Sequence, residues 1–138
     1  QKIKDAKSKT QDKKSSNVRN KLNFQSSTLT AIKTGMKNVV QAGSIKSLFN
    51  NVNVTVAGKT GTAQQDGHAN HGLFVGYAPY DDPEITIAVR IANGYNSHNA
   101  ATAARNVISY YYKETSMKDI KEMKAAGANG NIRNSVAD

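Results

Sequence analysis

The sequence predicts an α/β fold in which an antiparallel sheet is sandwiched by helices. Two stretches place apolar residues at helical spacing, and three stretches between them show the patterns of strands. The connections between these strands are short, which favours antiparallel pairing. The middle strand is apolar or small on both faces, so we expect helices on both sides of the sheet.

The chain divides into three zones of different composition. Residues 1–25 are polar and basic, and we expect a strand end followed by a basic loop. Residues 26–112 hold nearly all the large aliphatic side chains and form the compact part, whereas residues 113–138 are polar and predict a flexible tail. The first residue is Gln1 rather than methionine, so we expect an internal segment of a longer polypeptide.

The first predicted helix begins near Ser26 or Ser27, because either side chain can act as an N-cap. Its buried stripe is predicted from apolar residues at helical spacing, namely Leu29, Ile32, Met36, Val39 and Val40. Gly43 follows this stripe, where helices often end in a left-handed residue.

Three strands and a second helix follow. Valines at 52, 54 and 56 alternate with polar residues, which predicts a half-buried strand that ends in the Lys-Thr-Gly-Thr segment at 59–62. The second strand covers residues 73–78 and the third residues 84–92, with a turn at 79–83 between them. After a break at 93–96 comes the last helix. Its predicted buried stripe contains Ala100, Ala103, Ala104, Val107, Ile108 and Tyr111.

The Lys-Thr-Gly-Thr segment, called here the KTGT segment (residues 59–62), has the groups of a site for an acyl substrate. Lys59 offers a positive charge to a carboxylate, and the hydroxyls of Thr60 and Thr62 can donate to the same group. Gly61 has no Cβ, so a substrate backbone can lie against the strand there. The Thr62 N–H, at an open edge, can donate to a developing oxyanion. The segment alone also fits a solvated strand edge.

Four stretches around this segment occur in a fixed order. They are TGMKNVV at 34–40, VAGKTGTAQ at 56–64, NHGLFVGYAP at 70–79 and PEITIAV at 83–89. With them, residues 26–112 resemble class B penicillin-binding proteins, whose third active-site motif is Lys-Thr-Gly, as it is in related serine β-lactamases. The resemblance implies the C-terminal portion of a transpeptidase domain with the penicillin-binding and serine β-lactamase-like fold.

This resemblance implies a peptidoglycan D,D-transpeptidase that cross-links stem peptides through an acyl-serine intermediate. In that family a serine attacks the penultimate D-Ala carbonyl and releases the terminal D-Ala, and β-lactam antibiotics acylate the same serine. By position, Lys59 is implied in the proton network and in carboxylate binding, Thr60 and Thr62 in carboxylate binding, and the Thr62 N–H in the oxyanion hole. No cofactor is implied. The family's parent proteins are anchored in the cell membrane with the catalytic domain outside, and the anchor is not in these residues.

The nucleophile is missing from this chain. No Ser-x-x-Lys motif occurs, and the two Ser-x-Asn matches at 15–17 and 97–99 are badly placed relative to Lys59, so we interpret both as chance. We therefore expect the chain alone to be inactive. Its expected partner is the remainder of the transpeptidase domain with Ser-x-x-Lys and Ser-x-Asn, and its expected ligands are stem peptides and β-lactams.

Three residues between the first two strands form a weak metal candidate. Asp66, His68 and His71 lie close together in the sequence, and His-x-x-His can contribute to a metal site. His71 stands where the family often has a histidine before the next strand. A structural role is therefore favoured for His71, and no metal is assigned.

Composition limits the other functions. The net charge is +9, but the basic residues in 1–19 are interleaved with Ser, Gln and Asn and no aromatics, which indicates a solvated loop and no nucleic-acid partner. There is no cysteine, which excludes disulfides and thiolate zinc sites, and no apolar run long enough to span a membrane.

Two alternatives to the transpeptidase remain. A serine β-lactamase or β-lactam sensor domain shares the fold and the Lys-Thr-Gly strand, although the TAQ and FVGYAP sequences favour the transpeptidase. A non-catalytic basic binding module would instead bind an anionic polymer in a salt-dependent way.

Overall fold

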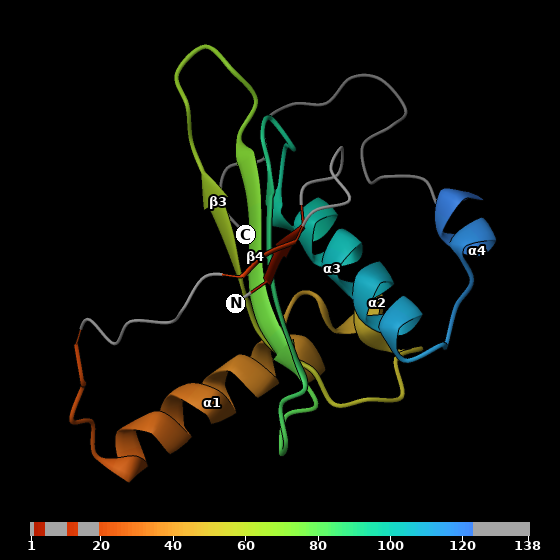
Figure 1. The fold of residues 1–138 in the computed structure, drawn as a ribbon. Helices are drawn as coiled ribbons and strands as arrows, with labels where there is room; N and C mark the ends of the chain where they lie inside the picture. The colour runs from red at the N-terminus through yellow and green to blue at the C-terminus, as the bar shows by residue number, and fades with distance from the viewer. Residues whose placement is uncertain (1, 5–10, 14–19, 123–138) are drawn as a thin grey trace.

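The computed structural model describes residues 2–4, 11–13 and 20–122 (Figure 1). The predicted tail beyond residue 122 and much of the predicted basic loop lie outside the described residues. In chain order the elements are β1 (Lys2–Lys4), β2 (Gln11–Lys13), α1 (Ser26–Gln41), α2 (Lys46–Phe49), β3 (Ala57–Ala63), β4 (His71–Ala78), β5 (Ile85–Ile91), α3 (Ser97–Tyr111) and α4 (Met117–Glu122). Within these ranges no helix is long and apolar enough to cross a membrane.

The compact part is built on a three-stranded antiparallel sheet (Figure 1). The strand order is β3-β4-β5, so β4 is central and β3 has an open edge within the described structure. The register places Thr60 of β3 opposite Phe74 of β4, and Phe74 opposite Val89 of β5. β1 and β2 pair with each other in a separate two-stranded sheet. The predicted α/β class and antiparallel pairing are confirmed.

One face of this sheet carries the hydrophobic core. Phe74 is fully buried at its centre, and its ring stacks on Phe49 of α2 with 6.0 Å between the centroids. The alternating residues of β5 pack against this core as predicted, namely Ile85, Ile87, Val89 and Ile91. α3 packs over this face and contacts all three strands of the sheet (Figure 1).

The buried face of α3 differs from the predicted stripe. Ala100, Ala104 and Ile108 are fully buried as predicted, but Val107 and Tyr111 are 49% and 51% exposed. Fully buried Ala101 completes the face instead. Alanines let the helix backbone approach the sheet closely, so the face of smallest residues, rather than the face of largest ones, meets Phe74.

α1 buries only its C-terminal end. Val40 is buried in the core, whereas Leu29 and Ile32 are 43% and 53% exposed, so the predicted stripe is wrong over the first turns. These turns lie away from the sheet in Figure 1. The predicted serine N-cap is also wrong, because Gln25 is the N-cap residue and no side chain caps the helix.

Gly43 ends α1 for a different reason from the predicted one. Its backbone is not left-handed, since Gly67 is the glycine with a positive φ among the described residues. A Cβ on Gly43 would lie 2.6 Å from the carbonyl oxygen of Val39. The close approach of the chain to the helix end therefore requires glycine here.

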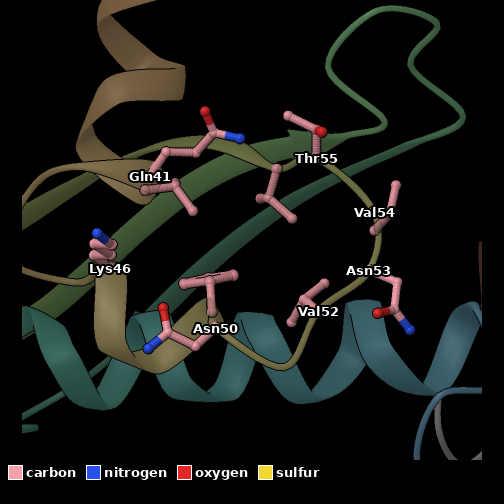
Figure 2. A pocket seen from close by; sticks show the side chains of 10 residues that line it. Gln41, Lys46, Asn50, Val52, Asn53, Val54 and Thr55 are labelled. Carbon is pink, nitrogen blue, oxygen red and sulfur yellow. The ribbon is translucent and has the colours of Figure 1, made fainter.

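Residues 51–56, predicted as a strand, are irregular, and β3 begins at Ala57. Continuing the β3–β4 register would place Thr55 opposite Pro79, which has no N–H to donate. The Thr55 carbonyl accepts from the Tyr80 N–H instead, at 2.8 Å. Residues 52–55 line a pocket of about 450 Å³, which Gln41 and Asn50 also line (Figure 2). The KTGT segment consequently lies inside β3 rather than at the end of a strand.

α1 covers the second face of the sheet only at one end of the strands. α1 reaches it through Tyr80, because Lys37 Nζ lies 4.7 Å from the Tyr80 ring centroid and Tyr80 stacks on Tyr77 of β4. Burial raises the pKa of Tyr77, with Tyr80 and Asp81 adding to the effect. Further along β4 this face is open within the described structure, since Val75 is 49% exposed.

Candidate functional site

The KTGT segment occupies the middle of β3, at the open edge of the sheet. Its residues pair with β4 in continuous register, from Lys59 opposite Val75 to Thr62 opposite Gly72. Paired residues point their side chains to the same face. Lys59 therefore shares the open face with Val75, whereas Thr60 and Thr62 share the face that α3 covers. A ligand along the edge can be contacted from both sides.

The backbone groups of the segment alternate between β4 and the open edge. The Ala78 carbonyl of β4 points toward β5, since it accepts from the Glu84 N–H, so Tyr77 turns its backbone groups toward β3 and its partner Ala57. In an extended chain every second residue points its N–H and C=O the same way. Residues 57, 59, 61 and 63 therefore face β4, and the N–H groups of Thr60 and Thr62 face outward. The predicted direction of the Thr62 N–H agrees with this geometry.

The Lys59 side chain lies across the edge of its own strand. Its side chain is exposed, and its Nζ donates to the carbonyl oxygen of Thr60 at 2.8 Å. That carbonyl is one of the outward-facing groups, so the ammonium lies at the open edge. The Lys59 ammonium and the outward N–H of Thr62 thus both lie along the open edge of β3.

The glycines around the segment fall into two kinds. A Cβ on Gly58 would lie 2.3 Å from Cζ of Phe74, and one on Gly76 would lie 2.7 Å from the Ala57 carbonyl oxygen. These two glycines make room for the buried Phe74 ring. A Cβ on Gly61 would meet only Leu73, at 3.5 Å, which is an ordinary contact. Packing within the described chain therefore does not require glycine at 61.

A second group of residues lies beside the end of the segment and was not predicted as part of the site. The turn at 93–96 contacts the start of β4, because the Asn93 N–H donates to His71 Nδ1 at 2.9 Å and the Tyr95 N–H donates to the Asn70 carbonyl at 2.9 Å. The sequence indicated only a break there. An Asn-Gly pair signals such a turn, but nothing local indicates its partner.

The weak metal candidates do not gather into a ligand cluster. Within the described ranges no group of three or more His, Cys, Asp or Glu side chains is placed to hold a metal ion. Asp66 and His68 are exposed in the β3–β4 loop, and His71 begins β4. The Nδ1 atom of His71 is already engaged by Asn93.

Three features meet on this edge strand: a lysine that lies across the edge, an outward N–H, and a glycine whose Cβ position is open. Together they are typical of a site that binds an extended peptide. Such an edge can hold an extended peptide by main-chain pairing, bind its carboxylate and polarise an acyl carbonyl. Residues 1–109 match the family described as the penicillin binding protein transpeptidase domain. The chain belongs to this family.

The relatives agree with this assignment. The chain is similar to the peptidoglycan D,D-transpeptidase MrdA of Haemophilus influenzae, with 39% identity over 103 residues that cover 61% of this chain and 16% of that protein. Its fold is similar to penicillin-binding protein 2B of Streptococcus pneumoniae, with a TM-score of 0.61, 30% identity and coverage of 72% and 18% of the two chains. The resemblance to class B penicillin-binding proteins is confirmed.

A third comparison gives the same fold. The D,D-transpeptidase domain of a peptidoglycan glycosyltransferase from Eggerthella lenta matches with a TM-score of 0.52 and 32% identity, covering 59% of this chain and 19% of that one. The chain spans 16% of the length of the curated MrdA relatives that it matches.

Proposed function

We propose that this chain supplies the substrate-binding strand of a serine-type peptidoglycan D,D-transpeptidase. Lys59 binds the carboxylate of a stem peptide and takes part in proton transfer at the serine. Thr60 and Thr62 donate to the same carboxylate, and the Thr62 N–H stabilises the oxyanion. The serine, its lysine and the Ser-x-Asn motif come from the remainder of the domain, which packs against the KTGT edge.

The observation that carries this proposal is the environment of Gly61. It is a glycine on the open edge with no close neighbour inside the described chain, flanked by Lys59 on one side and the outward Thr62 N–H on the other. A glycine that packing does not need indicates that something outside the chain approaches the backbone there. An extended peptide lying along the edge fits this requirement.

The location of the reaction and its inhibitors follow from the chemistry of the substrate. The substrate is a stem peptide of the cell wall, so the site works outside the cell membrane. A β-lactam offers a carboxylate and an acyl carbonyl, so it is bound by the same groups and acylates the serine.

The test is the intact mass of the polypeptides before and after incubation with a penicillin, with this chain joined to or mixed with the part that carries Ser-x-x-Lys. We expect the serine-bearing polypeptide to gain one penicillin mass. Lys59→Ala should slow this gain by at least about a hundredfold, because the charge at the carboxylate is lost. Lys46→Ala is the matched control, since Lys46 is an exposed lysine of α2 outside the edge.

The other outcomes distinguish the alternatives. An adduct that forms and then hydrolyses within seconds would indicate a β-lactamase. Salt-dependent binding of an anionic polymer without any adduct would indicate a basic binding module. Equal acylation in the Lys59→Ala and Lys46→Ala variants would contradict the role proposed for Lys59.

A further inference from the structure

The turn between β5 and α3 is held in an unfavourable backbone conformation. Asn93 and Tyr95 have φ values of 52° and 68°, in the left-handed region that non-glycine residues rarely adopt. Between them, a Cβ on Gly94 would lie 2.8 Å from Cβ of Ile91. Such a conformation persists only when surrounding contacts impose it, and strained turns of this kind cluster at functional sites.

Hydrogen bonds from β4 and from α3 hold this turn in place. The Asn93 N–H donates to His71 Nδ1, and the Tyr95 N–H donates to the Asn70 carbonyl, each at 2.9 Å. From the other side, Asn99 Nδ2 of α3 donates to the Gly94 carbonyl at 2.8 Å. The His71 contact is the one made by a titratable side chain.

The turn is also packed directly beside the strand residue that pairs with Thr62. A Cβ on Gly72 would lie 2.3 Å from the Asn96 carbonyl oxygen, so the turn rests on the backbone of Gly72. Gly72 pairs with Thr62, and His71 pairs with Ala63. The side chains of Thr62 and Gly72 point to the same face, so Asn96 lies over the face to which the Thr62 side chain points.

We propose that His71 is a positioning residue for the KTGT edge. Through Nδ1, its imidazole holds the 93–96 turn against the start of β4. That turn then fixes the part of the sheet that presents Thr62. The positional role stands on the contacts above, whereas its effect on acylation rests on the function proposed for the KTGT edge.

The chemistry of the contact requires an imidazole with a lone pair on Nδ1. A backbone N–H donates only to an unprotonated ring nitrogen, so the single ring proton resides on Nε2.

The first test uses this chain as it is and requires no catalysis. Nitrogen-15 NMR of the imidazole should show the Nε2–H tautomer for His71 at neutral pH, and the Asn93 amide should be protected from hydrogen exchange. His71→Phe keeps a ring but loses the acceptor, so the Asn93 amide should exchange roughly tenfold faster and the Thr62 amide signal should shift. His71→Asn places an oxygen near the position of Nδ1 and should restore both signals.

An Nδ1–H tautomer in the unsubstituted chain would overturn the proposal without any variant, even if His71→Phe failed to fold. Unchanged Asn93 exchange in a folded His71→Phe chain would overturn it as well. The second test follows penicillin acylation in the assembly with the serine-bearing part. His71→Phe should slow acylation roughly tenfold and His71→Asn should restore the rate. Equal rates would overturn the positioning role, whereas no acylation of the unsubstituted assembly would contradict the proposed function and leave the tautomer result standing.

Discussion

At the scale of single residues, Gly58 and Gly61 show how packing and function make different demands on one strand. Both lie on β3, three positions apart. Gly58 faces the buried ring of Phe74, and a Cβ there has no room. Gly61 faces Leu73 at an ordinary distance, so its Cβ position is open. Sequence alone presents two identical residues, and only the register with β4 separates their roles.

We expect Gly58→Ala to lower the free energy of unfolding by about 1–3 kcal/mol, because the added methyl group overpacks the core at Phe74. Gly61→Ala should change it by less than about 0.5 kcal/mol, as at an ordinary surface position. Urea unfolding of the chain measures both. In the assembly with the serine, Gly61→Ala should nevertheless slow penicillin acylation, and an unchanged rate would contradict the idea that a ligand backbone lies there.

Proline substitution tests the direction of the Thr62 N–H. Proline is tolerated on an edge strand when the lost N–H faces outward, but not when that N–H pairs with the next strand. Thr62→Pro should therefore leave the chain folded and greatly slow acylation, whereas Gly61→Pro should remove a bond to β4 and destabilise the sheet. Circular dichroism and urea unfolding give the first comparison. A Thr62→Pro chain that unfolds like Gly61→Pro would show that the alternation has been assigned the wrong way round.

At the scale of elements, the sequence predicted the strands that pair with a neighbouring strand. It wrongly predicted a strand at residues 51–56, which have no neighbouring strand to pair with. The alternation in β5 placed Ile85, Ile87 and Val89 correctly against the core. Residues 51–56 alternate just as regularly, yet the ladder stops where Pro79 offers no N–H. Periodicity reports which side chains can share a face, but a strand also needs a neighbour with free donors and acceptors.

The candidate site was predictable to the same extent. The KTGT segment is contiguous, so its residues and the groups that they offer to a ligand could be read directly from the sequence, whereas their roles stay predictions. The contact between His71 and Asn93 could not, because it joins residues 22 apart in the sequence through a left-handed backbone. In α1 the exposed first turns were missed for a related reason, since helical spacing does not indicate which surface will cover the stripe.

α4 offers a pH prediction at this scale. The Ser116 hydroxyl donates to Asp119 Oδ2 at 2.6 Å and accepts from the Asp119 N–H at 3.2 Å, which forms a capping box. These bonds, with that of the Ser116 N–H, lower the pKa of the Asp119 carboxyl. The cap therefore contributes fully above the unfolded pKa of about 4 and is lost as the pH falls through the lowered folded value.

NMR amide shifts of residues 117–122 should accordingly move toward random-coil values at acidic pH. Asp119→Asn should reduce the helical shifts of α4 at neutral pH and remove most of this pH dependence. Helical shifts of α4 that stay constant from pH 6 to pH 2 in the unsubstituted chain would rule out a contribution from the cap.

At the scale of the whole molecule, the hydrophobic core lies on one face of the sheet, and several large apolar side chains outside it are exposed. Large apolar side chains that are at least 43% exposed include Leu22, Phe24, Leu29, Ile32 and Val75. The first four belong to α1 and the segment before it, and Val75 belongs to the open face of β4. α1 contacts β3, the strand whose open edge we propose to meet the rest of the transpeptidase domain, so we expect these apolar side chains to be covered when the two parts meet.

Ile32→Gln tests this expectation. Because Ile32 is 53% exposed, the free energy of unfolding of the chain should change by less than about 0.5 kcal/mol. Reassembly with the serine-bearing part should weaken, as measured by the concentration needed for half-maximal penicillin acylation. Lys33→Gln, one residue along the same helix, is the control and should leave reassembly unchanged. Equal behaviour of the two variants would show that the α1 surface stays exposed in the assembly.

The bond between Lys59 and the Thr60 carbonyl has a thermodynamic consequence for recognition. A free lysine side chain has about 2 kcal/mol of rotamer entropy to lose when it is immobilised. Here part of that loss occurs on folding, because the ammonium is already held over the strand edge. A carboxylate bound as we propose would therefore meet a cation whose position is set, and more of the attraction between the two groups would remain as affinity. The edge is preorganised before any ligand is present.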